Sequence, residues 1–431
     1  MTKLAWRTER RKVRELIPAD YNPRVMTEKD KKDLTESIST YGEVEPVVVN
    51  TNNTLIGGHQ RVSIYADLGI EEIDVRVPDR ELSIEEEMRL NIRLNKNTGR
   101  WDKDKLKDFG VDMLLDVGFG SDDVSGIWDT GETEDDKHDE KKEVEKAKKD
   151  LRAKPGQLYQ LGRHRLLCGD STVLEDVARV VGEERIDVIY SDPPYNIGLD
   201  YSKGVGNKKG KYDGEYSAKS DSKADTDYLS FVNATMERAL SFAKKDAHVF
   251  YWCDQRYIWA MQTLFIQNKV DNKRVCMWIK NNASPTPGVA FNKAYEPCVY
   301  GTRGRPYLNN NFRAFNEIIN KETGTGNDLA QDIMDIMDLW IVKRETTQDY
   351  EHPTQKPTTL HEKPLKRCSA PGHNVLDSFG GSGSTLMACE QLNRNAFLIE
   401  KDPVFATVIL NRWEKYTGKQ ATLIKDNKKN I

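Results

Sequence analysis

The pentapeptide Ser191-Asp192-Pro193-Pro194-Tyr195 carries residue types that can orient an amino group for reaction. It closes an apolar run, Ile186 to Ser191, that predicts a buried strand, and ligands of open α/β sheets bind beyond the carboxyl ends of strands. Prolines have no backbone N–H, so they stiffen the turn and leave its carbonyls as fixed acceptors. The Asp192 carboxylate and the Pro193 carbonyl can hold the hydrogens of an aromatic amino group, while Tyr195 offers a ring for stacking. A rigid turn with an ordinary surface aspartate is the alternative interpretation.

A glycine-rich turn further along the chain has the features of a nucleoside site. It follows the predicted strand Asn374 to Asp377 and precedes a helical pattern from Thr385 to Leu392. Glycines allow a sharp turn and close backbone approach, and a helix N-terminus offers amide donors to a carboxylate or phosphate. Glu400 ends the next predicted strand, where such sheets place an acidic residue on ribose hydroxyls. We therefore predict cofactor contacts from Asp377, Phe379, Gly380, Gly381, Gly383 and Glu400.

The identity of the cofactor follows from what this turn lacks. A phosphate loop needs Gly-Lys followed by Ser or Thr, and the dinucleotide fingerprint needs a third glycine where Leu386 stands. S-adenosylmethionine, which has a ribose and a carboxylate but no phosphate, fits better. Thr354 and Lys356, in the segment His352 to Pro357, join the predicted cofactor site with Asp170, because a lysine can pair with a carboxylate and an aspartate can accept from an adenine amino group. A capping aspartate and a surface lysine are the alternatives.

The elements that must position these motifs alternate between strands and helices after residue 155, as in an α/β fold with a parallel sheet covered on both faces. An irregular segment occupies residues 195–226, and another spans about Thr302 to Tyr350. The strands predicted from apolar runs are Ile186 to Ser191, Ala247 to Cys253, Val275 to Ile279, Asn374 to Asp377 and Ala396 to Glu400.

The 431 residues suggest more than one domain. Residues 1–128 read as a small α+β domain, in which Thr27 with Asp30 resembles a capping box at a helix start and Ser83 with Glu86 marks a later helix start. Residues 129–154 are dominated by Glu, Asp and Lys and predict a solvated charged linker. The α/β domain then covers residues 155–431.

Composition limits the function further. The net charge of −4 leaves room for a local basic groove but not for an even positive coat. The six cysteines include no Cys-x-x-Cys pair and the seven histidines no ligand-spaced cluster, so we expect no metal site. No apolar run approaches the ~20 residues of a membrane helix and no secretory signal is visible, which predicts a cytoplasmic protein without a membrane partner.

Taken together, the Asp192 motif, the His352 to Pro357 segment and the glycine-rich turn resemble the beta group of DNA amino-methyltransferases. Trp278-Ile279-Lys280 and Tyr295-Glu296-Pro297 resemble supporting segments of that family. The resemblance implies a Rossmann-like sheet with helices on both faces, S-adenosylmethionine as donor, double-stranded DNA as partner, a flipped base and target recognition by about 302–350. Asp at position 192 resembles adenine-directed members, whereas cytosine N4 enzymes more typically carry Ser; methylation of cytosine, or of RNA, stays open.

The N-terminal domain resembles the ParB-like domain of partition proteins, which is also joined to methyltransferases in phage-like genes. The resemblance rests on Asn22-Pro23-Arg24, on Ile56-Gly57-Gly58-His59-Gln60-Arg61 and on Leu94-Asn95-Lys96-Asn97. Gly58 stands where the family's motif has an acidic residue, which weakens the case for nucleotide cleavage. Arg24, His59 and Arg61 are candidates for a phosphate or DNA site, with pairing to the acidic helix near residues 85–87 as the alternative.

The sequence as a whole predicts a site-specific adenine DNA methyltransferase of a bacterial or phage-infected cell, of the kind found in restriction-modification. A non-catalytic ParB-like DNA-binding factor is the rival from another class. Two partners stay open: a second copy of the chain, giving a homodimer, and a nucleotide at the N-terminal domain.

Overall fold

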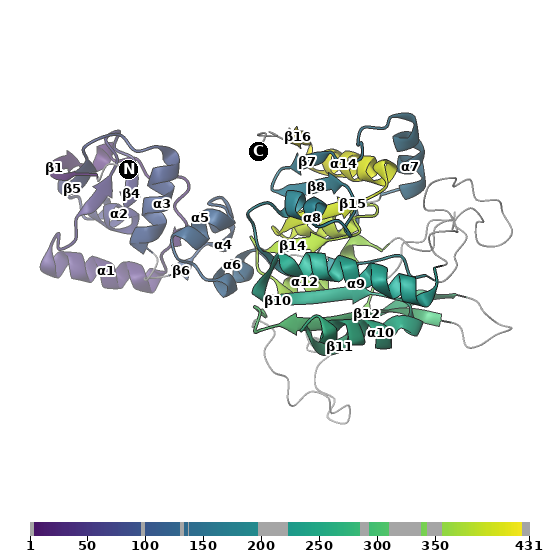
Figure 1. Cartoon of the computed structure of the whole chain (residues 1–431). Coiled ribbons are helices and arrows are strands. Elements are labelled where there is room, and N and C mark those ends of the chain that lie inside the picture. The colour runs from purple at the N-terminus through teal and green to yellow at the C-terminus, as the bar shows by residue number, and fades with distance from the viewer. Residues whose placement is uncertain are drawn as a thin grey trace, which may run out of the picture. The chain divides into compact units, whose positions relative to one another are not determined.

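The computed structural model describes residues 4–95, 100–129, 133–136, 138–196, 223–284, 293–309, 338–342 and 356–424. The chain divides into two compact units, Met1–Trp128 and Asp129–Ile431 (Figure 1). Within the described residues, no helix is both long and apolar enough to cross a membrane.

The first unit is an α+β domain built on a four-stranded sheet of order β1-β5-β3-β4. Branched side chains such as Val49, Ile64 and Val75 are fully buried between this sheet and its helices. The helix start predicted at Ser83 is confirmed, because Ser83 N donates to Glu86 Oε2 at 3.0 Å and Glu86 N donates to Ser83 Oγ at 3.3 Å. The helix expected near Thr27 begins at Glu28, and the side chain of Asp30 lies outside the described residues. The elements are β1 (Trp6–Lys12), η1 (Val13–Glu15), β2 (Arg24–Val25), α1 (Glu28–Tyr41), β3 (Val47–Val49), β4 (Leu55–Gly57), α2 (His59–Asp67), β5 (Glu72–Pro78), α3 (Ile84–Asn95), β6 (Arg100–Trp101), α4 (Lys103–Lys107), α5 (Val111–Asp116) and α6 (Ser121–Trp128).

The second unit contains a ten-stranded mixed sheet of order β13-β11-β12-β10-β9-β14-β15-β8-β7-β16. Its central strands are parallel. The strands are β7 (Leu158–Leu161), β8 (His164–Cys168), β9 (Ile186–Ser191), β10 (Ala243–Trp252), β11 (Asp271–Ser284), β12 (Lys293–Arg303), β13 (Leu339–Ile341), β14 (Asn374–Asp377), β15 (Asn395–Glu400) and β16 (Thr422–Ile424).

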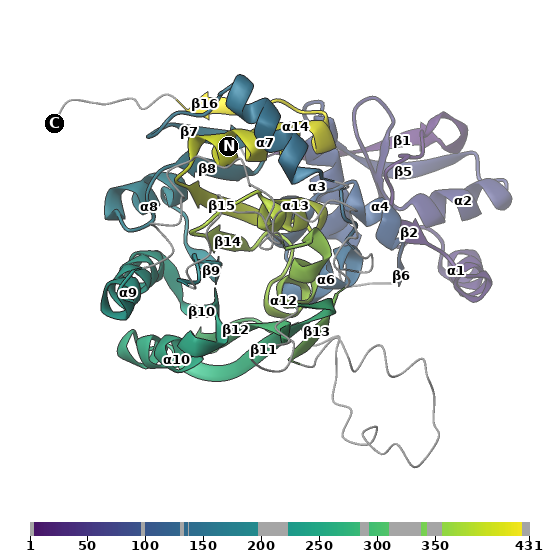
Figure 2. The same ribbon diagram turned by 90° about the vertical axis from the view of Figure 1, so that its right-hand side faces the viewer.

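Helices cover both faces of this sheet, as predicted (Figure 2). One apolar core joins α8, α9 and α10 to the sheet, and a second core lies under α12, α13 and α14. Every residue of β9 is buried, which explains its continuous apolar sequence. The helices are α7 (Glu140–Lys149), α8 (Leu174–Val181), α9 (Asp225–Ser241), η2 (Gln255–Tyr257), α10 (Ile258–Gln267), η4 (Thr358–His361), α12 (Glu362–Cys368), α13 (Ser384–Gln391) and α14 (Pro403–Thr417).

The prediction of a solvated linker at residues 129–154 is wrong for the described part of that segment. Val144 and Ala147 of α7 are buried and pack on Val408 of α14. Asp129 forms a buried ion pair with Arg394, and Arg152 pairs with Glu414 at 2.6 Å. The segment looks solvated in sequence because most of its charged side chains do face water, whereas a few charges and small apolar groups face the second unit.

The segment of about 302–350 also differs from a wholly irregular region. Thr302 and Arg303 belong to β12, and Leu339–Ile341 forms β13, which pairs with β11 in parallel. Residues 310–337 and 343–350 lie outside the described residues, as do residues 197–222 of the irregular segment predicted at 195–226.

Candidate active site

The two motifs singled out in the sequence end neighbouring strands. β9 and β14 pair in parallel, with Val188 opposite Val375 and Ile189 opposite Leu376. Asp192 begins the turn after β9, and Asp377 is the last residue of β14. Both acidic residues therefore lie at the carboxyl edge of the same sheet, where open α/β sheets bind ligands.

The Asp192 carboxylate is held by a buried lysine. Lys356 Nζ forms an ion pair with Asp192 Oδ2 and donates to the Tyr195 hydroxyl at 2.8 Å. It also lies 3.5 Å from Glu296 Oε2 and 4.6 Å from the centre of the Trp252 ring. The structure thus places Lys356 on the Asp192 motif, where it pairs with a carboxylate of the protein, although the sequence assigned it to the cofactor.

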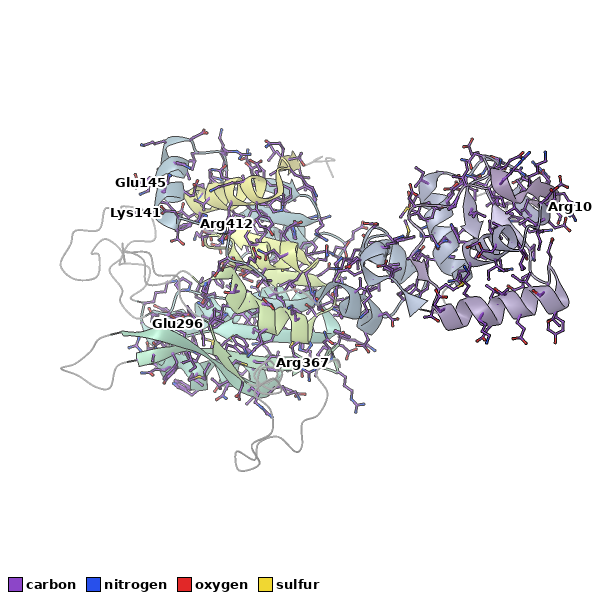
Figure 3. The ribbon with its side chains drawn as sticks, turned by 180° about the vertical axis from the view of Figure 1, so that it is seen from behind. Arg10, Lys141, Glu145, Glu296, Arg367 and Arg412 are labelled. Carbon is purple, nitrogen blue, oxygen red and sulfur yellow. The ribbon has the colours of Figure 1, made fainter. Side chains whose placement is uncertain are left out.

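A second lysine completes this buried cluster. Lys280 of β11 pairs with Glu296 of β12, and the Tyr195 hydroxyl donates to Glu296 Oε2 at 3.1 Å. Glu296 is labelled in Figure 3. Two carboxylates and two ammonium groups therefore balance one another, as buried charges require. Tyr195 is fixed through its hydroxyl, which determines the position of its ring.

Burial and the neighbouring ammonium groups shift the pKa values of Asp192 and Glu296 in opposite directions. Burial raises the pKa of Asp192, and the nearby Lys356 ammonium only partly offsets that rise. Burial also favours the neutral form of Glu296, but Lys356 and Lys280 outweigh it and lower its pKa. The carboxyl group with the greater tendency to hold a proton is therefore the one in the Asp192 motif.

Backbone hydrogen bonds to two buried carboxylates shape the glycine-rich turn. Phe379 N donates to Asp377 Oδ1 at 3.0 Å, and Gly381 N donates to Glu400 Oε2 at 2.7 Å. Burial raises the pKa of Asp377 to about 7 and that of Glu400 to about 8. Gly383 precedes α13 with a φ of +85°, a left-handed conformation that favours glycine.

Helix α14 packs against the glycine-rich turn through Ile409. A Cβ atom on Gly380 would lie 3.1 Å from Ile409 Cδ1, and one on Gly383 would lie 3.2 Å from Ile409 Cγ1. Close packing therefore favours glycine at both positions, and backbone conformation also favours it at Gly383. Arg412, one helical turn further along, donates to the Ser382 carbonyl at 2.9 Å.

The remaining cofactor candidates have different positions. Asp170 follows β8, accepts hydrogen bonds from Thr172 and lies 3.1 Å from Lys401 Nζ, so its carboxylate has local partners. It stands at the same edge as Glu400, because Gly169 N donates to the Glu400 carbonyl. Thr354 lies outside the described residues.

His361 and Arg412 were missed by the sequence analysis. The ring nitrogens of His361 contact the Tyr190 hydroxyl of β9 at 3.1 Å and Ser384 Oγ of α13 at 2.9 Å, which ties the two motifs together. Burial lowers the pKa of His361 to about 3. A lone histidine or arginine in a helical stretch gives no sequence signal for such a role.

The site has unused polar atoms that fit a methyl donor and an amino acceptor. Within the described residues, Asp192 Oδ1 and Ser378 Oγ are buried and have no hydrogen-bond partner. Buried polar atoms normally have partners, so these two are positioned for a ligand. No group of three histidine, cysteine or acidic side chains able to hold a metal occurs among the described residues.

The N-terminal candidates are engaged within their own unit. His59 Nε2 accepts a hydrogen bond from Ala19 N at 3.2 Å, and burial lowers the pKa of His59 to about 4. Arg61 pairs with Glu45 at 3.0 Å, and the side chain of Arg24 lies outside the described residues. His59 and Arg61 are therefore engaged by protein partners, and the phosphate or DNA site that would join them to Arg24 stays a prediction.

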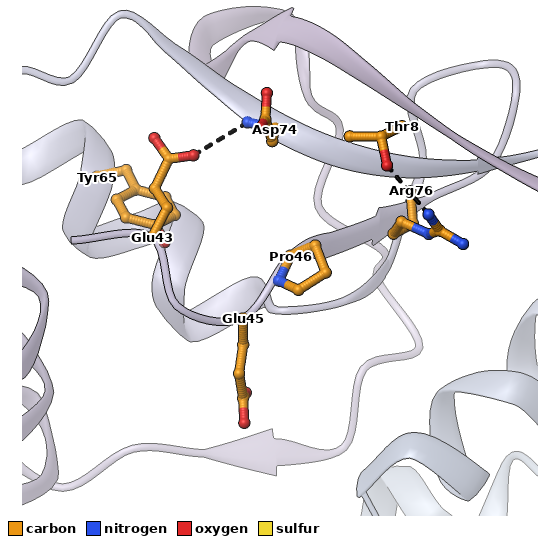
Figure 4. Close-up of a pocket in the computed structure, with 7 residues that line it drawn as sticks. All are labelled: Thr8, Glu43, Glu45, Pro46, Tyr65, Asp74 and Arg76. Carbon is orange, nitrogen blue, oxygen red and sulfur yellow. Dashed lines mark hydrogen bonds between the residues drawn. The ribbon is translucent and has the colours of Figure 1, made fainter. Parts of the chain in front are cut away.

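A shallow pocket does occur in this unit (Figure 4), and Glu45, the partner of Arg61, is one of the residues that line it. Glu43 accepts a hydrogen bond from Asp74 N at 3.1 Å, and Arg76 donates to Thr8 Oγ1 at 3.0 Å. Its three carboxylates oppose the binding of a phosphate. The pocket is lined by Thr8, Glu43, Glu45, Pro46, Tyr65, Asp74 and Arg76.

Comparison with known proteins identifies both parts of the chain. The DNA methylase family profile N6_N4_Mtase matches residues 186–411, and the ParB N-terminal domain profile matches residues 7–97. The chain belongs to the DNA methylase family and carries a ParB-like N-terminal domain. Membership of this family implies S-adenosylmethionine as the methyl donor.

The chain is also similar to two type II methyltransferases and to solved methyltransferase structures. The type II methyltransferase M.HpaI of Haemophilus parainfluenzae is 22% identical over 55% of this chain and 69% of its own length. M2.MboI of Moraxella bovis is 24% identical over 54% of this chain and 83% of its own. The M1.HpyAVI–SAM complex is 20% identical over 57% of this chain and 97% of that one, with a TM-score of 0.39. The cytosine-N4-specific PvuII methyltransferase is 16% identical over 64% and 92%, with a TM-score of 0.43.

Proposed function

We propose that this DNA methylase transfers the methyl group of S-adenosylmethionine to the exocyclic N6 amino group of adenine at a specific DNA site. The observation that carries the proposal is the Oδ1 atom of Asp192, which is buried and has no partner among the described residues. Asp192 directly follows β9, the strand that pairs with the one before the glycine-rich turn. An acceptor at this position can bind an amino hydrogen while the donor lies over the adjacent strand.

When bound, S-adenosylmethionine supplies an electrophilic methyl group. The chain's part is to orient the amino nitrogen: Asp192 Oδ1 and the Pro193 carbonyl accept its hydrogens, and the Tyr195 ring supports the base. The nitrogen gains a methyl group and loses one proton. Asp192, with its pKa raised by burial, is suited to receive that proton. No covalent intermediate with the enzyme is needed.

The choice of adenine rests on Asp192, because the family resemblance associates Asp at this position with adenine and Ser with cytosine N4. Cytosine N4 methylation is the alternative that the same geometry allows. A base inside a duplex cannot present its amino group to this edge, so the target base must be flipped out of double-stranded DNA.

The ParB-like unit gives the enzyme a second DNA-contacting domain under this proposal. Its occupied His59 and its ion-paired Arg61 do not favour a nucleotide bound by those two side chains. A purely non-catalytic DNA-binding factor is disfavoured by the complete acceptor motif.

Nucleoside mass spectrometry tests the proposal. Wild type, Asp192→Ala and Asp271→Ala are each incubated with labelled S-adenosylmethionine and mixed-sequence DNA, and the DNA is then digested. Asp271 is a matched aspartate because it begins β11, away from the motif, and pairs with Lys273 at the surface. We expect N6-methyladenine from wild type and Asp271→Ala, and at least about 100-fold less from Asp192→Ala, which still binds the donor.

N4-methylcytosine in place of methyladenine would replace the adenine assignment. The absence of any methylated base, on DNA or RNA, would favour the binding-factor alternative.

A further inference from the structure

We propose that Asp136 is a positioning residue for the methyl-donor loop, which it controls through Arg412. The inference rests on the proposed function, since it treats the glycine-rich turn as the donor site. Arg412 donates to both carboxylate oxygens of Asp136, from Nε at 2.7 Å and from Nη2 at 2.5 Å. Such a two-point contact fixes the guanidinium plane as well as its charge.

The same guanidinium reaches two segments of the active site. Arg412 Nη1 donates to the Ser382 carbonyl in the glycine-rich turn at 2.9 Å, and Nη2 donates to Thr358 Oγ1 at 3.2 Å. Thr358 begins η4, two residues after Lys356. Arg412, which is labelled in Figure 3, therefore connects the donor loop to the segment that carries the lysine of the acceptor motif.

Asp136 is what keeps Arg412 in this orientation. The Asp136 and Arg412 side chains are only 9% and 4% exposed, so the pair is almost dry. Removing one partner of a buried pair leaves the other charge uncompensated, and the long side chain then turns towards water or another acceptor. If Arg412 changes its orientation, its hydrogen bond to the Ser382 carbonyl is lost. The donor loop would then lose this polar contact with α14 and keep its apolar contact with Ile409.

Other residues of the segment 133–136 also bind elements of the active site. Asp135 accepts from Thr359 N at 3.2 Å, and Thr133 N and Oγ1 both donate to Glu362 at 2.6 Å. Residues 133–136 thus hold η4 and the start of α12 as well as α14. All four lie outside the part of the chain that the DNA methylase family profile matches.

The chain contains a matched control a few residues earlier. Asp129 makes an equally buried two-point pair with Arg394, whose Nη2 lies 3.0 Å from Asp129 Oδ2. Arg394 donates to the carbonyls of Ser369 and Leu392, which are not part of the glycine-rich turn. The two pairs resemble each other in burial and geometry but differ in what the arginine holds.

The experiment compares Asp136→Asn with Asp129→Asn in the full chain. Affinity for S-adenosylmethionine is measured by calorimetry, kcat and KM by methyl transfer, and stability by thermal unfolding. We expect similar losses of thermal stability in both variants. Asp136→Asn should raise the Kd and KM for the donor by about 10-fold with kcat changed less than about two-fold, whereas Asp129→Asn should leave donor affinity within about two-fold of wild type. Asp136→Glu should recover part of the affinity.

Equal donor affinities in the two asparagine variants, or a loss confined to kcat, would overturn the inference while the proposed function stands. If Asp136→Asn does not fold, Arg412→Lys takes its place, because lysine keeps the charge but cannot contact Asp136 and Ser382 in the same geometry. Unchanged donor affinity in that variant would equally refute the role. A wild-type chain that binds no S-adenosylmethionine would instead overturn the proposed function.

Discussion

The ammonium group of Lys356 donates a 2.8 Å hydrogen bond to the hydroxyl of Tyr195. The two residues are 161 positions apart in the sequence, and the same ammonium group also pairs with Asp192. Lys356 is 5% exposed, so its charge is compensated by protein carboxylates rather than by water. The acceptor motif is therefore completed by a side chain that lies far outside it in the sequence.

Replacing Lys356 should change the pH dependence of methyl transfer. In Lys356→Met the Asp192 carboxylate loses its cation, so its pKa, already raised by burial, rises further. A larger fraction of Asp192 is then protonated at neutral pH and cannot accept an amino hydrogen. We expect the acidic limb of the kcat/KM profile to move up by at least ~1 pH unit, and the rate at pH 7 to fall by about 10-fold or more.

A suitable control is Lys244→Met, which removes a lysine that pairs at 2.6 Å with Asp187 at the opposite end of β9. Its profile should overlay that of wild type. Identical profiles for Lys356→Met and wild type would contradict an electrostatic role for Lys356.

Gly383→Ala should destabilise the protein and weaken donor binding together. Its φ of +85° costs an alanine ~1–2 kcal/mol, and the new Cβ atom would lie 3.2 Å from Ile409 Cγ1. Gly418→Ala provides the comparison, because Gly418 has a φ of +69° but no neighbour within 4 Å of the added atom. We expect urea unfolding to show a loss in both variants and calorimetry to show weaker S-adenosylmethionine binding only in Gly383→Ala. Equal donor binding in the two would mean that the contact with Ile409 is unimportant.

Glu400 should make the folded protein less stable as the pH rises. Its pKa is about 8 in the folded state against an ordinary value of 4.5, so between these values the folded protein retains a proton that the unfolded chain releases. The unfolded state binds fewer protons there, and the free energy of unfolding falls with rising pH until Glu400 ionises near pH 8. Glu400→Gln removes this titration. Urea unfolding at pH 6.5 and 8.5 should show a decrease for wild type that exceeds that of the variant by on the order of 2 kcal/mol; parallel decreases would count against the assignment.

Much of the catalytic sheet was predictable because buried parallel strands have continuous apolar sequences. Ile186–Ser191 and Asn374–Asp377 were predicted with their observed bounds. β12 was not, since Pro297 interrupts its pattern; there the strand pairs with β11 on one side, and Cys253 N donates to the Pro297 carbonyl on the other. A proline is tolerated because its own N–H is not needed for these contacts.

The partners of charged residues were much harder to predict. Lys356 was assigned to a cofactor carboxylate, and Asp136 was placed in a solvated linker, because sequence shows a charge but not the charge that faces it. Both side chains turn out to be buried against partners on distant elements. The only local hint was the spacing of Val144 and Ala147, which puts two apolar groups on one face of an otherwise charged helix.

The described residues of the segment 129–154 pack against α14 and pair with Arg394 and Arg412. These contacts also determine at which residue a fragment of this protein should begin. A fragment that starts at residue 155 would retain the whole sheet and both motifs. It would, however, expose Arg394, Arg412 and the face of α14 on which Val408 lies. A fragment that starts at Asp129 would keep all of these contacts. The catalytic unit therefore begins with a stretch of acidic and basic residues that looks like a linker in the sequence. A variant in which the N-terminal domain is exchanged should keep this stretch attached to the catalytic unit.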